Sequence, residues 1–337
     1  MDKFELQDFN KRIKLNTDLK NISEQICIYY NLGDLVSNEL ITIGYEDYNY
    51  YLTTSKGKYC VKIFSKERTT NDIKNYLERI RAVANSEVSS PKPLLVNGDI
   101  TLSLDYNNNH YDLCVFEYIS GKNFFEIWEN LSSDVIKELA RQTSIIHSLD
   151  IKPEFIYDSW AIINFKEEYA KKRNYLPDKY KTEFDKLLIE FNNIDFEKLP
   201  KAFVHGDIIS TNVMLDEHSR VWIIDFAVSN YLPRIIDLAV TSCNMCLDKN
   251  SKDKTYENIT LLLNEYNKYN KLTDYELEVF GIFYKLANAM HVLQTQYIIQ
   301  TDGDSKENQY WLNEGVVGYS FSEDERLTKI LRWFYEF

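Results

Sequence analysis

The segment Val204-His-Gly-Asp-Ile-Ile-Ser-Thr-Asn-Val-Met214 decides the interpretation of this chain, because apolar residues flank a polar loop on both sides. The loop carries a carboxylate at Asp207 and, five residues later, an amide at Asn212. A carboxylate in a loop of this kind can orient a substrate hydroxyl and accept its proton. An amide oxygen suits Mg2+, a hard cation that prefers oxygen ligands. The segment therefore predicts a catalytic base beside a metal ligand.

Two further segments supply the remaining parts of a phosphoryl-transfer site. Asp225 ends the apolar run that begins at Val221, so we expect it at the edge of a strand near the Asp207 loop, as a second metal ligand. Lys62 lies within the apolar run from Tyr59 to Phe64 and needs an anionic partner if that strand is buried. Bound phosphate would satisfy it, since phosphoryl transfer requires metal ligands and cations on the nucleotide phosphates.

The hydrophobic pattern changes along the chain. Strand-like runs are expected at 39–44, 48–54, 58–64 and 111–119, with a helix over about 70–84. Helical periodicity dominates after about residue 123. The order predicts an α+β protein with a small antiparallel-sheet lobe over 1–119, preceded by a helical extension, and a larger helical lobe over 120–337 that holds the catalytic loop.

Two helix starts can be predicted within the second lobe. Thr273 and Glu276 form the pattern of a capping box, which predicts a long helix reaching about Gln300. Asp178, which follows Pro177, is expected to cap an earlier helix. His147 and His291 fall in helical segments, where we expect satisfied core residues rather than ligands.

Composition excludes several classes of partner. The chain has 337 residues and a net charge of −13, which disfavours nucleic acid and anionic membrane surfaces and favours a cationic small substrate. No stretch is apolar enough to span a membrane. An odd, scattered set of cysteines predicts a reducing compartment. These cysteines are Cys27, Cys60, Cys114, Cys243 and Cys246. A cytoplasmic location is the default expectation, because the N-terminal residues do not have a basic region followed by an apolar run.

The motifs together resemble the aminoglycoside phosphotransferase family, whose relatives include choline, homoserine and hydroxylysine kinases. His205-Gly-Asp207 with Asn212 is similar to the catalytic loop of that family, and Ile224-Asp225-Phe226 is similar to its metal motif. Pro233 and Asp237-Leu-Ala239 resemble the segment that follows. The resemblance covers about residues 40–300 and implies a protein-kinase-like fold that uses ATP and Mg, with GTP left open as an alternative.

The resemblance also implies roles for individual residues. Asp207 would be the catalytic base, Asn212 and Asp225 the metal ligands, and His205 and Asp237 structural braces of the site. Lys62 would bind phosphate and pair with a helix acid, for which Glu78 is the candidate and Asp72 the alternative. The segment Gly44–Tyr50, which contains Asn49, resembles the nucleotide loop. Glu117–Gly121 resembles the linker between lobes, whose backbone at Glu117 and Ile119 would bind adenine.

Two departures separate the chain from protein kinases. Gly206 stands where a protein kinase has Arg, and Ile209 stands where it has Lys. We therefore expect a small hydroxyl-bearing acceptor, and we favour an amino alcohol or a hydroxy amino acid such as homoserine. An aminoglycoside kinase or a choline-type kinase is the alternative. A catalytically inactive nucleotide-binding regulator is the second alternative.

Overall fold

The computed structural model describes residues 19–41, 47–66, 68–127 and 131–328. The chain divides into two compact units, which we describe separately. The first comprises residues up to Asn85 together with Ser90–Gly121, and the second comprises Ser86–Ser89 and the chain from Lys122 onward. The α+β, protein-kinase-like fold class expected from the sequence is confirmed. The expected strand over 39–44 is described only as far as Ile41, and Gly44 lies outside the described residues.

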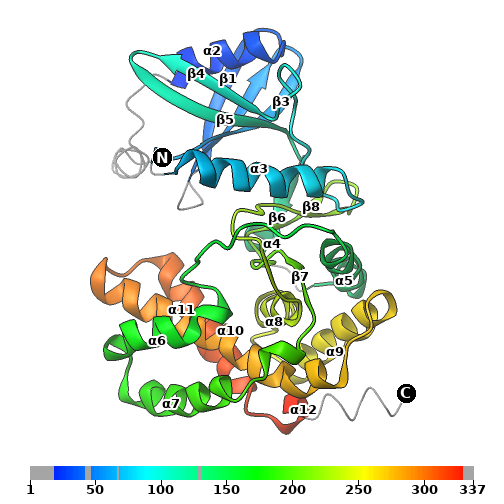
Figure 1. Cartoon of the computed structure of the whole chain (residues 1–337), viewed down its shortest axis with the longest axis vertical. Coiled ribbons are helices and arrows are strands. Elements are labelled where there is room, and N and C mark those ends of the chain that lie inside the picture. Colours follow the sequence, from blue (N-terminus) through cyan, green and yellow to red (C-terminus); the bar gives the residue numbers. More distant parts are fainter. Residues whose placement is uncertain (1–18, 42–46, 67, 128–130, 329–337) are drawn as a thin grey trace. The chain divides into compact units, whose positions relative to one another are not determined.

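In its described residues, the first unit has a five-stranded antiparallel sheet and the two helices α2 and α3, and Figure 1 shows their arrangement. The strands follow the order β1-β2-β3-β5-β4. In chain order the elements are α2 (Leu19–Tyr29), β1 (Leu35–Ile41), β2 (Tyr48–Thr54), β3 (Gly57–Ile63), α3 (Thr70–Ala84), β4 (Thr101–Tyr106) and β5 (Asn109–Glu117).

One face of this sheet forms the core of the first unit. Ile22 and Ile26 of α2 are fully buried against alternate residues of the strands, among them Tyr50 and Val61. Because side chains alternate across a strand, Lys62 lies on the opposite face from Val61. The ring of Tyr76, on α3, lies 5.3 Å from the Lys62 ammonium. The sheet therefore separates the apolar core from the face that carries Lys62.

The second unit is mainly helical. Its long helix α10 packs against α6, α7, α8 and α11 (Figure 1). The helices are α4 (Phe124–Ile127), α5 (Ser133–His147), α6 (Phe165–Lys172), α7 (Asp178–Asn192), α8 (Ile235–Asn244), α9 (Lys252–Tyr269), α10 (Asp274–Thr301), α11 (Lys306–Phe321) and α12 (Glu325–Thr328). The strands are β6 (Gly121–Asn123), β7 (Lys201–Val204), β8 (Val213–Asp216), β9 (Val221–Ile223) and β10 (Asn230–Pro233).

The two predicted helix starts differ in outcome. The capping box at Thr273 and Glu276 is present, and α10 extends to Thr301, so this prediction is confirmed. Asp178 is not a cap, because it is the first residue of α7 and Pro177 holds the N-cap position without a side-chain hydrogen bond. Proline lacks an amide N–H and its fixed backbone angle suits the start of a helix, which explains the shift by one residue. No helix in the described ranges has the length and apolar character needed to cross a membrane.

Candidate active site

The loop from His205 to Asn212 links two short strands of the helical unit. Strand β7 ends at Val204, which pairs with Asn230 at the start of β10. Gly206 follows in the left-handed region with φ +88°, and a Cβ there would lie 3.3 Å from the carbonyl oxygen of Val228. Glycine adopts this conformation without steric cost. The glycine that separates this chain from protein kinases is therefore also required by the shape of the loop.

His205 is fully buried and bridges the loop to the next strand. Its Nδ1 accepts a hydrogen bond from the backbone N–H of Asp207 at 3.1 Å, and its Nε2 donates to the carbonyl of Ile224 at 3.0 Å. Burial lowers the pKa of His205, which keeps the ring neutral with its proton on Nε2. These are the contacts that the predicted bracing role requires.

Asp237 fixes the start of the same loop through hydrogen bonds to its backbone. Its two carboxylate oxygens accept the backbone N–H groups of His205 and Gly206, each at 2.7 Å. His147 Nε2 lies 3.0 Å from Asp237 Oδ2, and Tyr266 OH lies 2.7 Å from His147 Nδ1. Burial raises the pKa of Asp237, but the hydrogen bond from His147 and the neighbouring groups outweigh it and hold that pKa below its usual value. His147, expected as a satisfied core residue, is hydrogen-bonded and also anchors this brace.

Asp207 and Asn212 lie side by side. Asn212 Nδ2 donates to Asp207 Oδ2 at 2.7 Å and to the Asp207 carbonyl at 3.0 Å. The pKa of Asp207 is raised to about 7, first by burial and then by the charges of Asp158 and Asp225. Negative charge is therefore concentrated around the predicted base.

A hairpin brings Asp225 to the same place. In the β8–β9 pairing Val213 lies opposite Ile223, so the next residues outward, Asn212 and Ile224, also meet, with Ile224 N–H donating to the Asn212 carbonyl at 2.9 Å. Asp225 follows at once, with an exposed side chain and φ +64°. A non-glycine residue in this region is uncommon and is often found at functional sites.

The donor set of this hairpin fits a hard divalent cation. Asn212 uses its Nδ2 for Asp207, which leaves its amide oxygen for a metal, and Asp225 adds a carboxylate. Asp158 and Asp225 both contribute negative charge near Asp207, after burial, to the rise of its pKa. Within the described residues, no three His, Cys, Asp or Glu side chains gather as a metal cluster. The two oxygen donors would therefore share a cation with phosphate or water, as Mg2+ commonly binds.

In the sheet unit the structure places Asn49 beside Lys62. The two residues are directly opposite in the β2–β3 register, so they share a face of the sheet. Lys62 is buried, and its ammonium lies 3.4 Å from the carboxylate of Asp47. Glu78 does not pair with Lys62 as expected, because it is exposed on α3. The alternative, Asp72, instead accepts the Thr69 N–H at 2.7 Å and caps the helix.

Glu117 and Ile119 lie at the end of β5, where the first unit ends. The Glu117 N–H donates to the Lys92 carbonyl and its carboxylate accepts the Lys92 N–H, each at 3.0 Å. Ile119 is buried, and its carbonyl accepts the N–H of Gly121 at 3.0 Å. The segment is thus held at both ends by backbone hydrogen bonds, and its role toward adenine stays a prediction.

Four aromatic side chains, which we call the aromatic group, lie near the catalytic loop: Phe125, Trp160, His291 and Trp311. No sequence motif indicated this group. His291 stands between Trp160 and Trp311, with ring centroids 6.1 and 5.7 Å away. Phe125 stacks on Trp311 at 6.0 Å, and its N–H donates to the Ser210 carbonyl of the catalytic loop at 3.0 Å. Burial lowers the pKa of His291 to about 4, so the ring is neutral, and its Nδ1 is buried without a hydrogen bond within the described structure. The expectation of a satisfied core histidine is therefore wrong for His291.

Asp158 connects the aromatic group to the predicted base. Its carboxylate accepts the backbone N–H of Trp160, two residues along the chain, at 3.0 Å. It is also close enough to Asp207 for its charge to raise the pKa of that group. The segment that holds Asp158 and Trp160 is far from Asp207 and His291 in the chain. No local sequence pattern could therefore have predicted that they lie close together.

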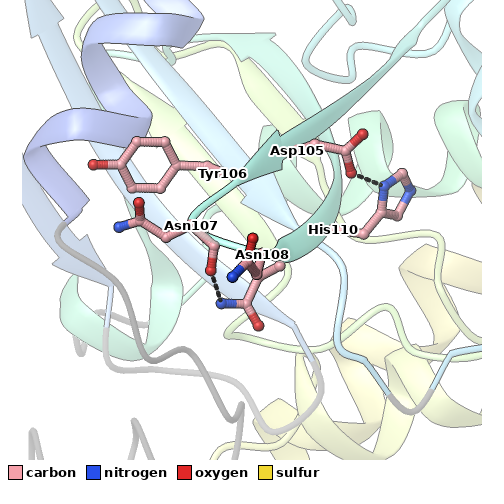
Figure 2. Close-up of a pocket in the computed structure, with 6 residues that line it drawn as sticks. Asp105, Tyr106, Asn107, Asn108 and His110 are labelled. Carbon is pink, nitrogen blue, oxygen red and sulfur yellow. Dashed lines mark hydrogen bonds and ion pairs between the residues drawn. The ribbon is translucent and has the colours of Figure 1, made fainter.

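The turn between β4 and β5 carries a shallow hollow in the sheet unit (Figure 2). It is lined by residues 105–110, and His110 Nδ1 lies 2.8 Å from the Asp105 carboxylate. All of these residues belong to one hairpin turn, and none is a predicted site residue. The hollow therefore contributes nothing to the candidate active site.

The fold is protein-kinase-like, and the family to which the chain belongs makes it a phosphotransferase. A family model described as "Phosphotransferase enzyme family" matches residues 38–260. The chain belongs to this family. Its relatives and structural neighbours are small-molecule kinases, so the expected enzyme class is confirmed.

Curated relatives carry the name homoserine kinase. The protein from Methylobacillus flagellatus is 22% identical over 220 residues, which cover 65% of this chain and 66% of that protein. The protein from Zymomonas mobilis is 22% identical over 289 residues, covering 82% of this chain and 85% of that protein. A protein from Paraburkholderia phymatum is 38% identical over 66 residues, but these cover only 20% of each chain.

Solved structures show the same fold at lower identity. An amicoumacin kinase in complex with AMP-PNP, Ca2+ and Ami has a TM-score of 0.67 and 18% identity, covering 93% of this chain and 96% of that one. A microcompartment-associated aminopropanol kinase has a TM-score of 0.61 and 15% identity, covering 92% and 98%. These likenesses establish the fold.

Proposed function

We propose that this protein transfers the γ-phosphoryl group of ATP, with Mg2+, to the hydroxyl of a small amine-bearing molecule. The observation that carries the proposal is the Asp207–Asn212 pair: a carboxylate with a pKa of about 7, held by the amide of Asn212 in a loop braced from two sides. A base with a pKa near the working pH is the most effective in proton transfer. The structural neighbour bound to AMP-PNP and Ca2+ supports the use of a nucleotide and a divalent cation.

The proposed reaction forms a bond between the acceptor oxygen and the γ-phosphorus and breaks the bond from that phosphorus to the bridging oxygen of ADP. The hydroxyl proton passes to Asp207, and ADP leaves with the bond electrons. Asn212 and Asp225 would hold the cation, which neutralises charge on the phosphates when bound. Lys62 would contact a phosphate of the nucleotide. We also propose a cytoplasmic location, where ATP would be available to the enzyme.

An amine on the acceptor is supported by the surroundings of Asp207. Asp158 supplies a carboxylate, and the aromatic group supplies ring faces, which attract cations. His291 is neutral and would not repel an ammonium group. Homoserine kinases among the relatives and an aminopropanol kinase among the neighbours favour an amino alcohol or hydroxy amino acid such as homoserine.

Two alternatives remain distinct from this proposal. An aminoglycoside-type or choline-type acceptor is favoured by the neighbours named spectinomycin phosphotransferase and choline kinase. An inactive nucleotide-binding regulator is disfavoured, because Asp207, Asn212 and Asp225 retain the polar groups that the reaction needs.

A panel of acceptors in a coupled ADP-release assay tests the proposal. Homoserine, 1-amino-2-propanol, choline and spectinomycin are offered with ATP and Mg2+, each against a no-acceptor blank. We expect acceptor-dependent ADP release to be highest with a primary-amine alcohol. Turnover of spectinomycin alone would replace our acceptor class, and nucleotide binding without turnover of any acceptor would favour the regulator.

The Asp158→Asn variant tests the amine site in particular. Removal of the carboxylate should raise the KM for the best amine acceptor several-fold and leave the KM for ATP unchanged, since the interaction is with the ammonium group. Glu197→Gln, an exposed acid on the same unit, is the matched control. An acceptor KM equal to that of the wild type would remove Asp158 from the site.

A further inference from the structure

Lys62 forms an ion pair with Asp47, whereas a helix acid, Glu78 or Asp72, was expected as its partner. Asp47 directly precedes β2, and only 3% of its surface is exposed. Arg68 binds it through two parallel hydrogen bonds, Nε to Oδ1 at 2.7 Å and Nη2 to Oδ2 at 2.9 Å. The Ser65 N–H donates to Oδ1 at 3.1 Å, and Lys62 Nζ lies 3.4 Å from Oδ2. Within the described residues, Asp47 is therefore a carboxylate that contacts both cations.

Asp47 is ionised despite its burial. Burial raises its pKa, but Lys62, Arg68 and the Ser65 N–H outweigh that effect, so the pKa lies below its usual value. A buried carboxylate is tolerated when it is paired and hydrogen-bonded in this way. The negative charge beside Lys62 is thus present at neutral pH.

Helix α3 does not present a carboxylate to Lys62. From α3, Tyr76 packs against Lys62: its ring centroid lies 5.3 Å from Nζ, and the residue is 2% exposed. Glu78 points to solvent, and Asp72 is used in the capping box with Thr69. An aromatic ring therefore occupies the place where a helix acid was expected.

We propose that Asp47, fixed by Arg68, is the positioning residue that orients Lys62 for nucleotide phosphate, in place of an acid on α3. This inference rests on the proposed function, in which Lys62 contacts phosphate. Arg68 holds Asp47 through two short bonds, whereas the contact between Lys62 Nζ and Asp47 Oδ2 is longer, at 3.4 Å. Lys62 can therefore turn toward a phosphate while Arg68 keeps the buried carboxylate paired.

The test compares ATP with adenosine, which lacks phosphate. Affinity is measured by calorimetry for ATP, and by competition against ATP for adenosine. We expect Asp47→Asn to weaken ATP binding by ~10-fold, about 1.4 kcal/mol, and to leave adenosine unchanged. Lys62→Ala is the positive control and should weaken ATP in the same selective way. Glu78→Gln, the equivalent change on α3, should leave both ligands unchanged.

Arg68→Lys provides a second variant in case Asp47→Asn does not fold. This variant keeps the positive charge but removes the bidentate hydrogen bonding to Asp47. We therefore expect a smaller loss of affinity for ATP and an unchanged affinity for adenosine. Equal weakening of ATP and adenosine would reduce Asp47 to a structural role and overturn the inference. Wild-type affinity in Asp47→Asn, with a loss in Lys62→Ala, would overturn it while the proposed function stands. If Lys62→Ala binds ATP normally, the proposed role of Lys62 itself fails.

Discussion

At the scale of single residues, the site is a set of groups held away from their ordinary states. Asp207 carries a raised pKa, Asp225 a left-handed backbone, and His205 a neutral ring in full burial. The states of Asp207 and Asp225 cost stability and suit groups that must act on a ligand. His205 is hydrogen-bonded at both ring nitrogens and supports the loop. Asp237 offsets part of this cost, since it satisfies two backbone N–H groups of the loop that have no strand partner.

The raised pKa of Asp207 predicts a dependence of stability on pH. Its pKa moves from 3.8 to about 7 in the folded protein, so the folded state binds the proton more tightly than the unfolded state. The stability from this group is complete below the unfolded value and is lost as pH rises through about 7. Asp207→Asn does not titrate, so without ligands its melting temperature relative to the wild type should increase between pH 4 and pH 8.

Thermal melts of both proteins across this range measure the effect. Asn212→Asp offers a contrasting control, because it adds a charge to the same cluster and should lower the melting temperature most at alkaline pH. A constant difference between Asp207→Asn and the wild type at all pH values would contradict the raised pKa.

At the scale of elements, the features that depend on local sequence patterns were predicted better than those that depend on contacts between distant segments. Strands β2 and β3 and helix α3 lie where the alternation and turn residues place them, to within a residue. The His205–Asp225 region was also predictable, since its hydrogen bonds join residues within one loop and one hairpin. The Asp47 contact, the His147 brace and the aromatic group join distant segments through packing, which a single sequence does not encode locally.

The caps of two helices allow a prediction at the same scale. Thr273 caps α10, which runs through the helical unit, and Thr69 caps α3 in the sheet unit. Thr273→Ala should reduce the free energy of unfolding by ~1 kcal/mol, since one helix-end N–H loses its partner. Thr69→Ala is the matched control in the other unit.

Chemical denaturation and steady-state kinetics distinguish the two caps. Thr273→Ala should keep the wild-type KM for ATP, because its helix carries none of the proposed nucleotide-binding residues. An altered KM for ATP together with unchanged stability would contradict the assignment of Thr273 as a purely structural cap.

At the scale of the whole molecule, the net negative charge affects how the protein could bind a metal ion and a nucleotide. The net charge of −13 disfavours the approach of ATP, so the proposed phosphate binding would depend on local cations and a bound metal. Lys62 and Arg68 are such cations, and Asn212 and Asp225 are the proposed metal ligands.

Removal of the metal should therefore remove most of the stabilisation by ATP. With Mg2+ and ATP at about 100 times its Kd, the folded state should gain about 2.7 kcal/mol, seen as a higher melting temperature. Addition of EDTA should remove most of this gain, while Asp225→Asn should reduce it with Mg2+ present. Adenosine is the control, because its effect should not depend on the metal. An equal gain from ATP with and without EDTA would contradict the proposed metal site.

The central claim is that Asp207 takes the proton of the acceptor hydroxyl, and the Asp207→Asn variant tests it most directly. Turnover is measured with the best acceptor of the panel, and ATP affinity is measured separately by calorimetry. We predict a fall in kcat of about 10²- to 10⁴-fold, with ATP affinity largely retained, because a general base acts on the chemical step. A kcat equal to that of the wild type would contradict the account.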